Sequence, residues 1–112
     1  MTAMSPEVGQ VVTVFRSRLR PEAVGAYADD AGRIAALART MPGYVEHKAF
    51  AADDGERVTL VTFADRASHD GWRDHPEHRA AQRRGIADYY RTYSIQVGTT
   101  DYASGFVLGQ GA

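Results

Sequence analysis

The order of the predicted elements constrains the fold more than any other feature of this sequence. Stretches rich in β-branched and aromatic residues predict strands over residues 11–17, 44–50, 58–63 and 92–97. A long helix is predicted after the first strand and a second helical region after the third. The order β-α-β-β-α-β is typical of the split βαβ, ferredoxin-like unit, in which both helices cover one face of a four-stranded antiparallel sheet. We therefore predict an α+β fold.

The helix boundaries follow from proline and glycine positions. Pro21 at a first helical position, with Glu22 in the first turn, predicts the start of the long helix, and Pro42-Gly43 predicts its end. Its apolar residues recur with a period near 3.6 and are Val24, Tyr27, Ala31, Ile34, Leu37 or Ala38, and Met41. The second helical region carries Trp72, and Pro76 interrupts or restarts it.

A turn at residues 52–56 with Asp54-Gly55 predicts a hairpin and, from it, the two faces of the sheet. We assume that Phe50 pairs with Val58, so that side chains alternate between faces. The face expected under the helices holds Val45, His47, Ala49, Thr59, Val61 and Phe63, and the other holds Tyr44, Glu46, Lys48, Phe50, Val58, Leu60 and Thr62. His47 is then the titratable group on an apolar face, and a slip of one residue would reverse the assignment.

The length and net charge of the chain limit the number of domains and the kinds of partner that we expect. The 112 residues predict one domain, 1–112, with a core at about 10–98 and a C-terminal extension at 99–112. A net charge near −1 argues against nucleic-acid and anionic-membrane partners, and the absence of cysteine excludes disulfides and a thiolate nucleophile. Without a signal-like start or a long apolar stretch, we expect a cytoplasmic protein. Helices on one face leave the other bare, which predicts a homodimer.

Three segments together resemble the antibiotic biosynthesis monooxygenase (ABM) family. Met-Pro-Gly precedes the strand at residues 44–50, Asp-Gly-Glu precedes the strand at 58–63, and residues 72–78 read Trp-x-x-His-Pro-Glu-His. The resemblance covers roughly residues 10 to 98. It implies a dimeric α+β barrel with a pocket between sheet and helices in each subunit. Similar proteins include oxygenases that convert anthrones or hydroquinones to quinones without metal or flavin, and haem-degrading enzymes.

Two departures from the family bear on function. The haem-degrading branch pairs a first-strand Asn with a helical Trp and a His ten residues later; here Trp72 fits, but Gln82 stands in the His position and the chain has no Asn. Haem is therefore disfavoured as a cofactor, and no cofactor is expected. The anthrone-oxidising branch carries an Asn and a Trp on the third strand, where this chain has Thr59 and Phe63.

Oxygenation without a cofactor needs a base with a pKa near neutral, a dry pocket and groups that stabilise an oxyanion. We expect His47 to be the base, with Trp72 and Phe63 walling in the ring. The candidate catalytic residues are His47, Trp72 and His75, and the candidate substrate-binding residues are Arg16, Phe63, His78, Gln82 and Tyr89. No metal site is expected, because the His-x-x-His spacing at 75–78 has no third ligand.

Each candidate also has a structural interpretation. His47 fits a hydrogen-bonded core histidine, Trp72 a core anchor, and Arg16 a charge at the solvated end of a strand. One face of the second helical region is expected to meet the sheet and holds His78, Ala81, Gln82, Gly85, Ile86 and Tyr89. Tyr89 and Tyr90 are expected to point to different sides, so that at most one lines a pocket.

The resemblance thus implies a cofactor-independent monooxygenase that uses dioxygen on a small aromatic or polyketide-like phenol or anthrone in secondary metabolism. The alternative is a non-oxidative binding protein, or a cyclase or isomerase of the same fold. A third possibility is haem held by His75 or His78. Oxygen consumption distinguishes the first two.

Overall fold

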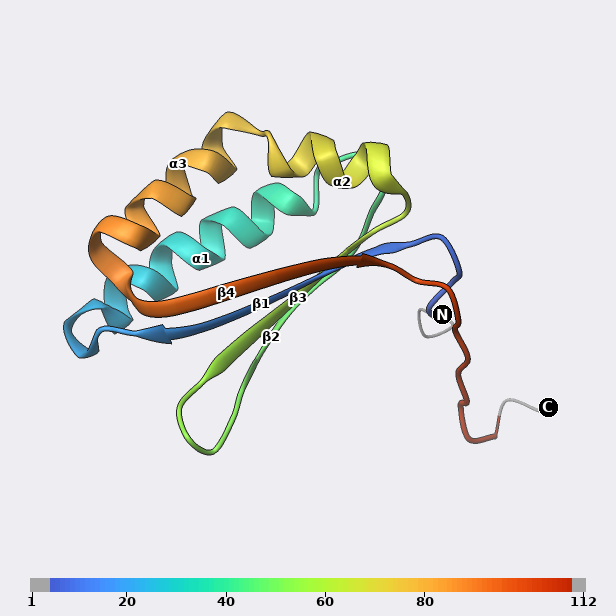
Figure 1. Ribbon diagram of the computed structural model, residues 1–112, viewed down its shortest axis with the longest axis horizontal. Helices are drawn as coiled ribbons and strands as arrows, with labels where there is room; N and C mark the ends of the chain where they lie inside the picture. Colours follow the sequence, from blue (N-terminus) through green and yellow to red (C-terminus); the bar gives the residue numbers. More distant parts are fainter. Residues whose placement is uncertain (1–4, 110–112) are drawn as a thin grey trace.

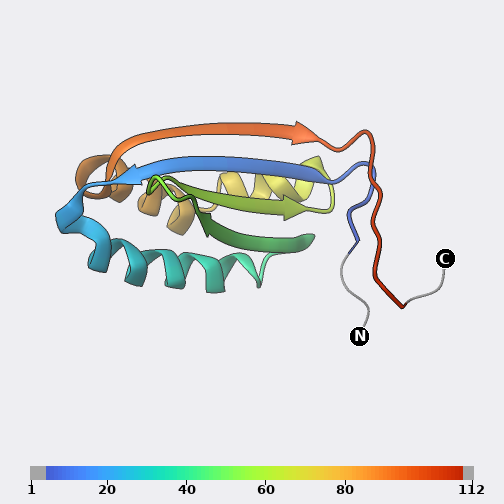
Figure 2. The same cartoon turned by 90° about the horizontal axis from the view of Figure 1, so that it is seen from below.

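The computed structural model describes residues 5–109, and the order of its elements is the predicted one (Figure 1). The strands are β1 (Val11–Leu19), β2 (Tyr44–Ala51), β3 (Arg57–Phe63) and β4 (Tyr90–Thr99). The helices are α1 (Val24–Ala38), α2 (Arg66–Arg73) and α3 (Pro76–Arg84), with a 3₁₀ turn at Pro21–Ala23 and a π-helical turn at Gly85–Tyr89. The strands form one antiparallel sheet in the order β2-β3-β1-β4, and all three helices lie on one of its faces (Figure 2).

The first helix is shorter than predicted at both ends. Pro21 begins a 3₁₀ turn, α1 itself begins at Val24, and α1 ends at Ala38 rather than near Pro42. Pro42 has no N–H to donate to the Ala38 carbonyl oxygen, which accepts instead from the Met41 amide at 3.1 Å, so the α-helical hydrogen bonding ends there. Gly43 then turns the chain into β2 with a φ of +76°, and a Cβ there would lie 2.1 Å from the Ser68 hydroxyl oxygen. This position therefore requires glycine.

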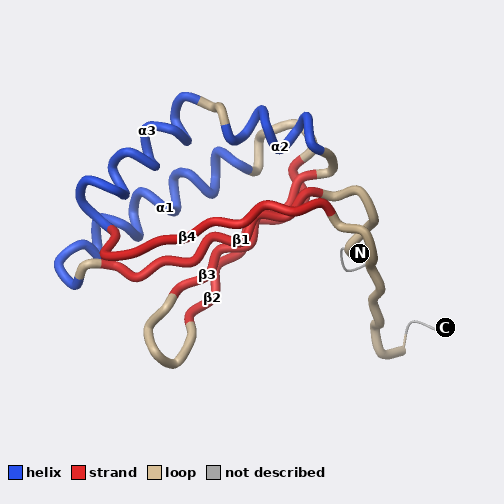
Figure 3. The backbone as a smooth tube through the Cα atoms, viewed as in Figure 1, coloured by secondary structure: helices blue, strands red, loops and turns tan. Residues whose placement is uncertain are grey.

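The second helical region is two helices, α2 and α3, separated at Pro76 as the sequence indicates (Figure 3). Asp65 caps α2 by accepting a hydrogen bond from the Ser68 amide at 2.8 Å. His75 caps α3 in the same way, since its Nδ1 accepts from the Glu77 amide at 3.1 Å. The break changes the direction of the chain between Trp72 and His78, which allows these two side chains to meet.

The register of the hairpin is the assumed one over most of its length, with Phe50 opposite Val58 and His47 opposite Val61. Between Tyr44 and Glu46 it shifts by one residue. The predicted face of Tyr44 was therefore wrong, because Val45 is the extra, unpaired residue of a β-bulge. Tyr44 lies opposite Phe63 and meets its ring edge to face, with ring centroids 6.2 Å apart.

The buried core lies under α2 and the C-terminal end of α1. It consists of Ala38, Val61, Phe63 and Trp72, with Ile34, Leu37, Met41 and Tyr44 packed against it. Phe63 is fully buried and stacks on Trp72 with centroids 6.4 Å apart. Because this cluster fills one end of the space between sheet and helices, the other end is left for a cavity.

The far face of the sheet has no helix over it within residues 5–109 (Figure 2). It presents Val12, Val14 and Leu60, which are partly exposed, and Phe50, which is 48% exposed. Beyond β4 the chain runs away from the sheet (Figure 1). Residues 1–4 of the predicted domain and 110–112 of the predicted extension lie outside the described residues. None of the helices in the described part combines the length and the apolar character needed to cross a membrane.

Candidate active site

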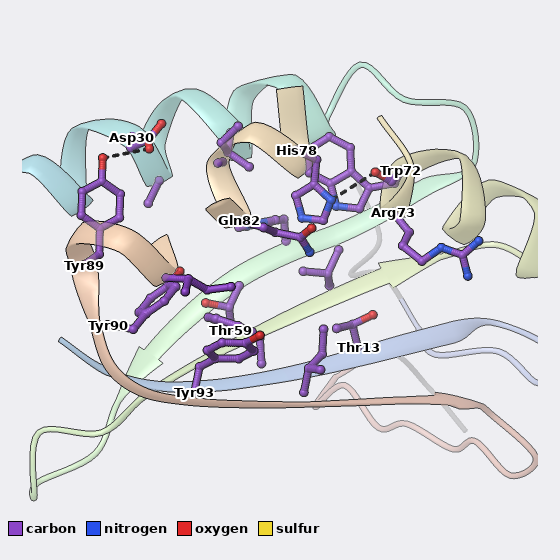
Figure 4. Close-up of a pocket in the computed structure, with 18 of the residues that line it drawn as sticks. Thr13, Asp30, Thr59, Trp72, Arg73, His78, Gln82, Tyr89, Tyr90 and Tyr93 are labelled. Carbon is purple, nitrogen blue, oxygen red and sulfur yellow. Dashed lines mark hydrogen bonds between the residues drawn. The ribbon is translucent and has the colours of Figure 1, made fainter. Parts of the chain in front are cut away.

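A cavity of about 340 Å³ lies between the helices and the face of the sheet that they cover. Its walls are mostly apolar and aromatic, with Phe15, Tyr90 and Tyr93 on the sheet side and Tyr27 and Ile34 on α1. Polar groups gather at its two ends (Figure 4): Trp72 and His78 lie at one end, and Asp30 and Tyr89 at the other. A concave, mainly apolar space with a few convergent polar groups is the usual form of a small-molecule site.

Five of the eight candidate residues line this cavity. They are His47, Trp72, His78, Gln82 and Tyr89. The structure brings them together from β2, α2, α3 and the π-helical turn, elements that are far apart in the sequence. Gln82 lies between the two ends (Figure 4).

Three candidates lie outside the cavity wall. Arg16 is on the opposite face of the sheet, where its guanidinium donates to the Glu56 carboxylate at 3.0 and 2.8 Å. Phe63 is buried behind Trp72 and supports that ring from the core. His75 caps α3, which occupies its Nδ1.

Trp72 combines the two interpretations that the sequence left open. It is 4% exposed and belongs to the core cluster, and it also forms part of the cavity wall. The His78 ring stacks on its indole with centroids 4.4 Å apart and an interplanar angle of 19°. His78 Nδ1 lies 3.2 Å from the Trp72 carbonyl oxygen. The two side chains therefore form one rigid unit.

The imidazoles of this end are shifted towards their neutral forms. Burial lowers the pKa of His47 below its usual value, and the positive charge of Arg39 adds to the effect. Burial likewise lowers the pKa of His78, against the opposing effect of its backbone hydrogen bonds. A third histidine, His69 of α2, also lines the cavity, and its Nδ1 lies 2.9 Å from an Asp70 carboxylate oxygen. Neutral imidazoles can accept a proton at physiological pH.

The other end is built around a charged carboxylate. Asp30 of α1 is 9% exposed and accepts hydrogen bonds from Arg84 at 2.7 and 2.8 Å, from Arg33, and from the Tyr89 hydroxyl at 3.0 Å. The hydrogen bonds from Arg84 are the main reason why the pKa of Asp30 falls to about 2. Burial and the neighbouring carboxylate raise the pKa of Tyr89. Its phenol therefore stays protonated and donates to Asp30.

Asp30 was not among the predicted site residues, and Tyr89 and Tyr90 do not point to different sides as predicted. Asp30 falls between Tyr27 and Ile34 on the apolar stripe of α1, and a carboxylate on such a stripe is a signal that a partner is present. Tyr89 and Tyr90 both line the cavity, contrary to expectation. The reason is that Tyr89 ends a π-helical turn and Tyr90 begins β4, so helical spacing does not apply between them.

Gly85 makes room for the Tyr90 ring. A Cβ at Gly85 would lie 2.3 Å from Cε2 of Tyr90, which is closer than real side chains approach. Burial raises the pKa of Tyr90 above its usual range, so this phenol is neutral. Over residues 5–109, no three histidine or acidic side chains converge as a metal site would require.

The amino-acid sequence of this chain matches a known protein family. The family model described as "Antibiotic biosynthesis monooxygenase" matches residues 10–84. The chain is 28% identical over 97 residues to the uncharacterized protein YqjZ of Bacillus subtilis, covering 87% of this chain and 84% of that one.

Solved structures share the fold at low sequence identity. Rv0793 from Mycobacterium tuberculosis superposes with a TM-score of 0.75 at 21% identity, over 86% of this chain and all of that one. SnoaB from Streptomyces nogalater, described as a cofactor-independent oxygenase, superposes with a TM-score of 0.70 at 18% identity, over 91% of this chain and 99% of that one. With a family model matched over most of its length and the same ferredoxin-like sheet, the chain belongs to the antibiotic biosynthesis monooxygenase (ABM) family.

Proposed function

We propose that the protein uses dioxygen to oxygenate a small, electron-rich aromatic compound, a phenol or anthrone of the kind made in secondary metabolism, without metal or flavin. The observation that carries the proposal is the cavity itself: aromatic walls next to partly buried imidazoles whose pKa values are lowered. The description of SnoaB as a cofactor-independent oxygenase supports this chemistry for the fold. In the proposal Trp72 and Tyr93 flank the substrate ring, and Gln82 and Tyr89 bind its oxygen atoms.

The chemistry balances with dioxygen as the sole oxidant. Loss of a proton from an anthrone-type methylene to an imidazole, His47 or His78, leaves a carbanion that passes one electron to dioxygen. The substrate radical and superoxide then combine through a new carbon–oxygen bond, and the peroxide takes up the proton from the imidazolium. Cleavage of the O–O bond with loss of the second methylene proton leaves a carbonyl group and one molecule of water.

Trp72, the only tryptophan of the chain, reports ligand binding. We would titrate the protein without oxygen with 1,8-dihydroxyanthrone, with a hydroquinone and with hemin, following the Trp72 fluorescence, and then admit oxygen and record its uptake. Saturable quenching followed by uptake above that of heat-unfolded protein is the expected result for an aromatic substrate. Because anthrones also react slowly with air, the unfolded control is essential.

A non-oxidative role is the second candidate. It is favoured by Thr59 and Phe63, which stand where the anthrone-oxidising relatives carry Asn and Trp, and by Phe63 lying behind the cavity wall. An imidazole that removes a proton can also drive an isomerisation or cyclisation in which oxygen takes no part. Quenching of Trp72 without oxygen uptake would replace the oxygenase proposal by this one.

We also propose that a second copy of the chain covers the far face of the sheet, because the apolar residues there have no helix over them within residues 5–109. Sedimentation equilibrium is expected to show a dimer, and Phe50→Glu is expected to shift it to a monomer. The matched control is Val24→Glu, because Val24 is an apolar residue of α1 that is 56% exposed, and this variant is expected to leave the dimer unchanged.

A further inference from the structure

The hydrogen bond of His78 fixes which ring nitrogen carries the proton. Its Nδ1 lies 3.2 Å from the Trp72 carbonyl oxygen, and a carbonyl oxygen only accepts hydrogen bonds. Nδ1 must therefore carry the hydrogen. In the neutral ring this leaves Nε2 with a free lone pair, the form in which an imidazole acts as a base.

Nε2 of His78 is also accessible from the cavity. The side chain lines the cavity, and its hydrogen bond to the Trp72 carbonyl is made by Nδ1, the other nitrogen of the ring. Nε2 of His78 is also not a fully buried nitrogen that lacks a hydrogen-bonding partner. Among the described residues, Nε of Arg57 is the only such side-chain atom. A ligand in the cavity can therefore contact Nε2 directly.

We propose that Nε2 of His78 is the base that takes the proton from the substrate. The inference rests on the proposed function for the class of substrate, an aromatic carbon acid or phenol, and on the geometry of this chain for the residue. The electron pair of the broken bond stays on the substrate, and the proton forms an imidazolium at His78. The stacked Trp72 indole and the carbonyl oxygen at Nδ1 both stabilise that cation.

His78 is better prepared for this role than the other two histidines of the cavity. His47 lines the cavity from β2, and within residues 5–109 no hydrogen bond or ring stacking ties its imidazole to a neighbouring element. His69 is 6% exposed and is tied to the Asp70 carboxylate. His78 is held by a stacked ring and a backbone carbonyl at the same time, and such preorganisation of a catalytic group is what makes proton transfer efficient.

Burial keeps His78 neutral before the reaction, and the positive charges that can form around it add to the effect. His47 on β2 and His75 at the start of α3 oppose its protonation, and α2 contributes Arg73 and His69 to the same cavity. The carboxylate of α1, Asp30, lies at the far end (Figure 4). With burial as the main cause, the pKa of His78 is lowered, so its basic form predominates at pH 7.

Deuterium exchange without oxygen separates this inference from the oxygenase proposal. In D₂O under argon, a base in the cavity accelerates replacement of the methylene hydrogens of 1,8-dihydroxyanthrone by deuterium, which mass spectrometry counts. His78→Asn is the informative variant, because the Asn amide can still donate to the Trp72 carbonyl but has no basic nitrogen. His78→Gln provides a second test should His78→Asn be poorly folded, as judged by circular dichroism.

We expect both His78 variants to slow the exchange by about 100-fold or more, the usual contribution of a general base. His47→Asn is expected to slow it by less than about tenfold, and Asp29→Asn, at an exposed residue of α1 outside the cavity, is the control with unchanged exchange. Exchange at the wild-type rate in folded His78 variants would overturn the inference, as would a wild-type protein that does not accelerate exchange. Exchange that depends on His78 but is not followed by oxygen uptake would support the inference and reject the oxygenase reaction.

Discussion

The two ends of the cavity carry different kinds of polar group: neutral imidazoles at one end and a charged carboxylate at the other. At the histidine end, neutral imidazoles lie against the aromatic core, and their pKa values are lowered mainly by burial. At the other end, Asp30 carries a permanent charge that is matched by Arg84 and Arg33. The comparison shows that a single cavity can separate groups that exchange protons near neutral pH from groups that hold a fixed charge. We assign chemistry to the first end and orientation of the ligand to the second.

Trp72→Ala is expected to have the largest effect on stability. The indole is 4% exposed and stacks on both Phe63 and His78, so its removal leaves a cavity in the core. We expect a loss of roughly 3–5 kcal/mol in the free energy of unfolding, measured by urea denaturation and circular dichroism, since the variant has no tryptophan. A loss below about 1 kcal/mol would show that the histidine end does not depend on the core.

Asp30→Asn is expected to have a smaller, pH-dependent effect. The neutral amide weakens the contacts with Arg84 and Tyr89, and we expect a loss of roughly 1–2 kcal/mol at pH 7, discounted because Arg84 lies partly in solvent. The pKa of Asp30 is about 2 in the folded protein, below its usual value. Its contribution is therefore complete above about pH 4 and is lost as the pH falls through 2.

Urea denaturation of the wild type and Asp30→Asn across this pH range measures the effect, and the two curves are expected to converge at low pH. Asp29→Asn is the matched control, because Asp29 is the exposed neighbour on the same helix. A constant difference between wild type and Asp30→Asn from pH 7 to pH 2 would contradict a charged role for Asp30.

His47→Asn is expected to change the pH dependence at the other end. The pKa of His47 is lowered in the folded protein, so the unfolded chain binds more protons as the pH falls below about 6.5. Stability is therefore lost on acidification in this higher range, and Asn in place of His47 is expected to remove part of that loss, under about 1 kcal/mol. The measurement is urea denaturation at pH 7 and pH 5. An identical loss in both proteins would argue against a partly buried His47 with a lowered pKa.

Arg16→Ala is expected to have the smallest effect on the cavity. The guanidinium pairs with Glu56 on the opposite face of the sheet, and exposed ion pairs contribute little. We expect unchanged quenching of Trp72 by aromatic ligands. A weaker affinity in this variant would restore Arg16 as a ligand-binding residue and would imply that the far face takes part in the site.

The architecture could be predicted because its signals are local. Strand alternation, Pro76, and the Asp54-Gly55 turn indicate the elements and the pairing of Phe50 with Val58. The bulge in β2 could not be predicted, because it depends on how the extra residue is accommodated against β3. Tyr44 therefore changed faces while His47, beyond the bulge, kept its predicted one.

The part of the site that could be predicted consists of residues whose side-chain type and position on a strand or helix face indicate a role. His47, His78, Gln82 and Tyr89 follow from position on a strand or helix face. Asp30 was missed because its role depends on Arg84, which is 54 residues away in the sequence and is brought close by the packing of α3 on α1. Long-range ion pairs of this kind leave little trace in a single sequence.

The absence of a side chain at Gly85 has an evolutionary consequence. One methyl group there would displace the Tyr90 ring from the wall of the cavity, whereas glycines on the outside of α1, such as Gly32, have open space around them. A single codon change can thus reshape the binding site while sheet and helices stay in place. In a family whose members form their site between the same elements, a single substitution at such a position can change which ligand shape the site accepts.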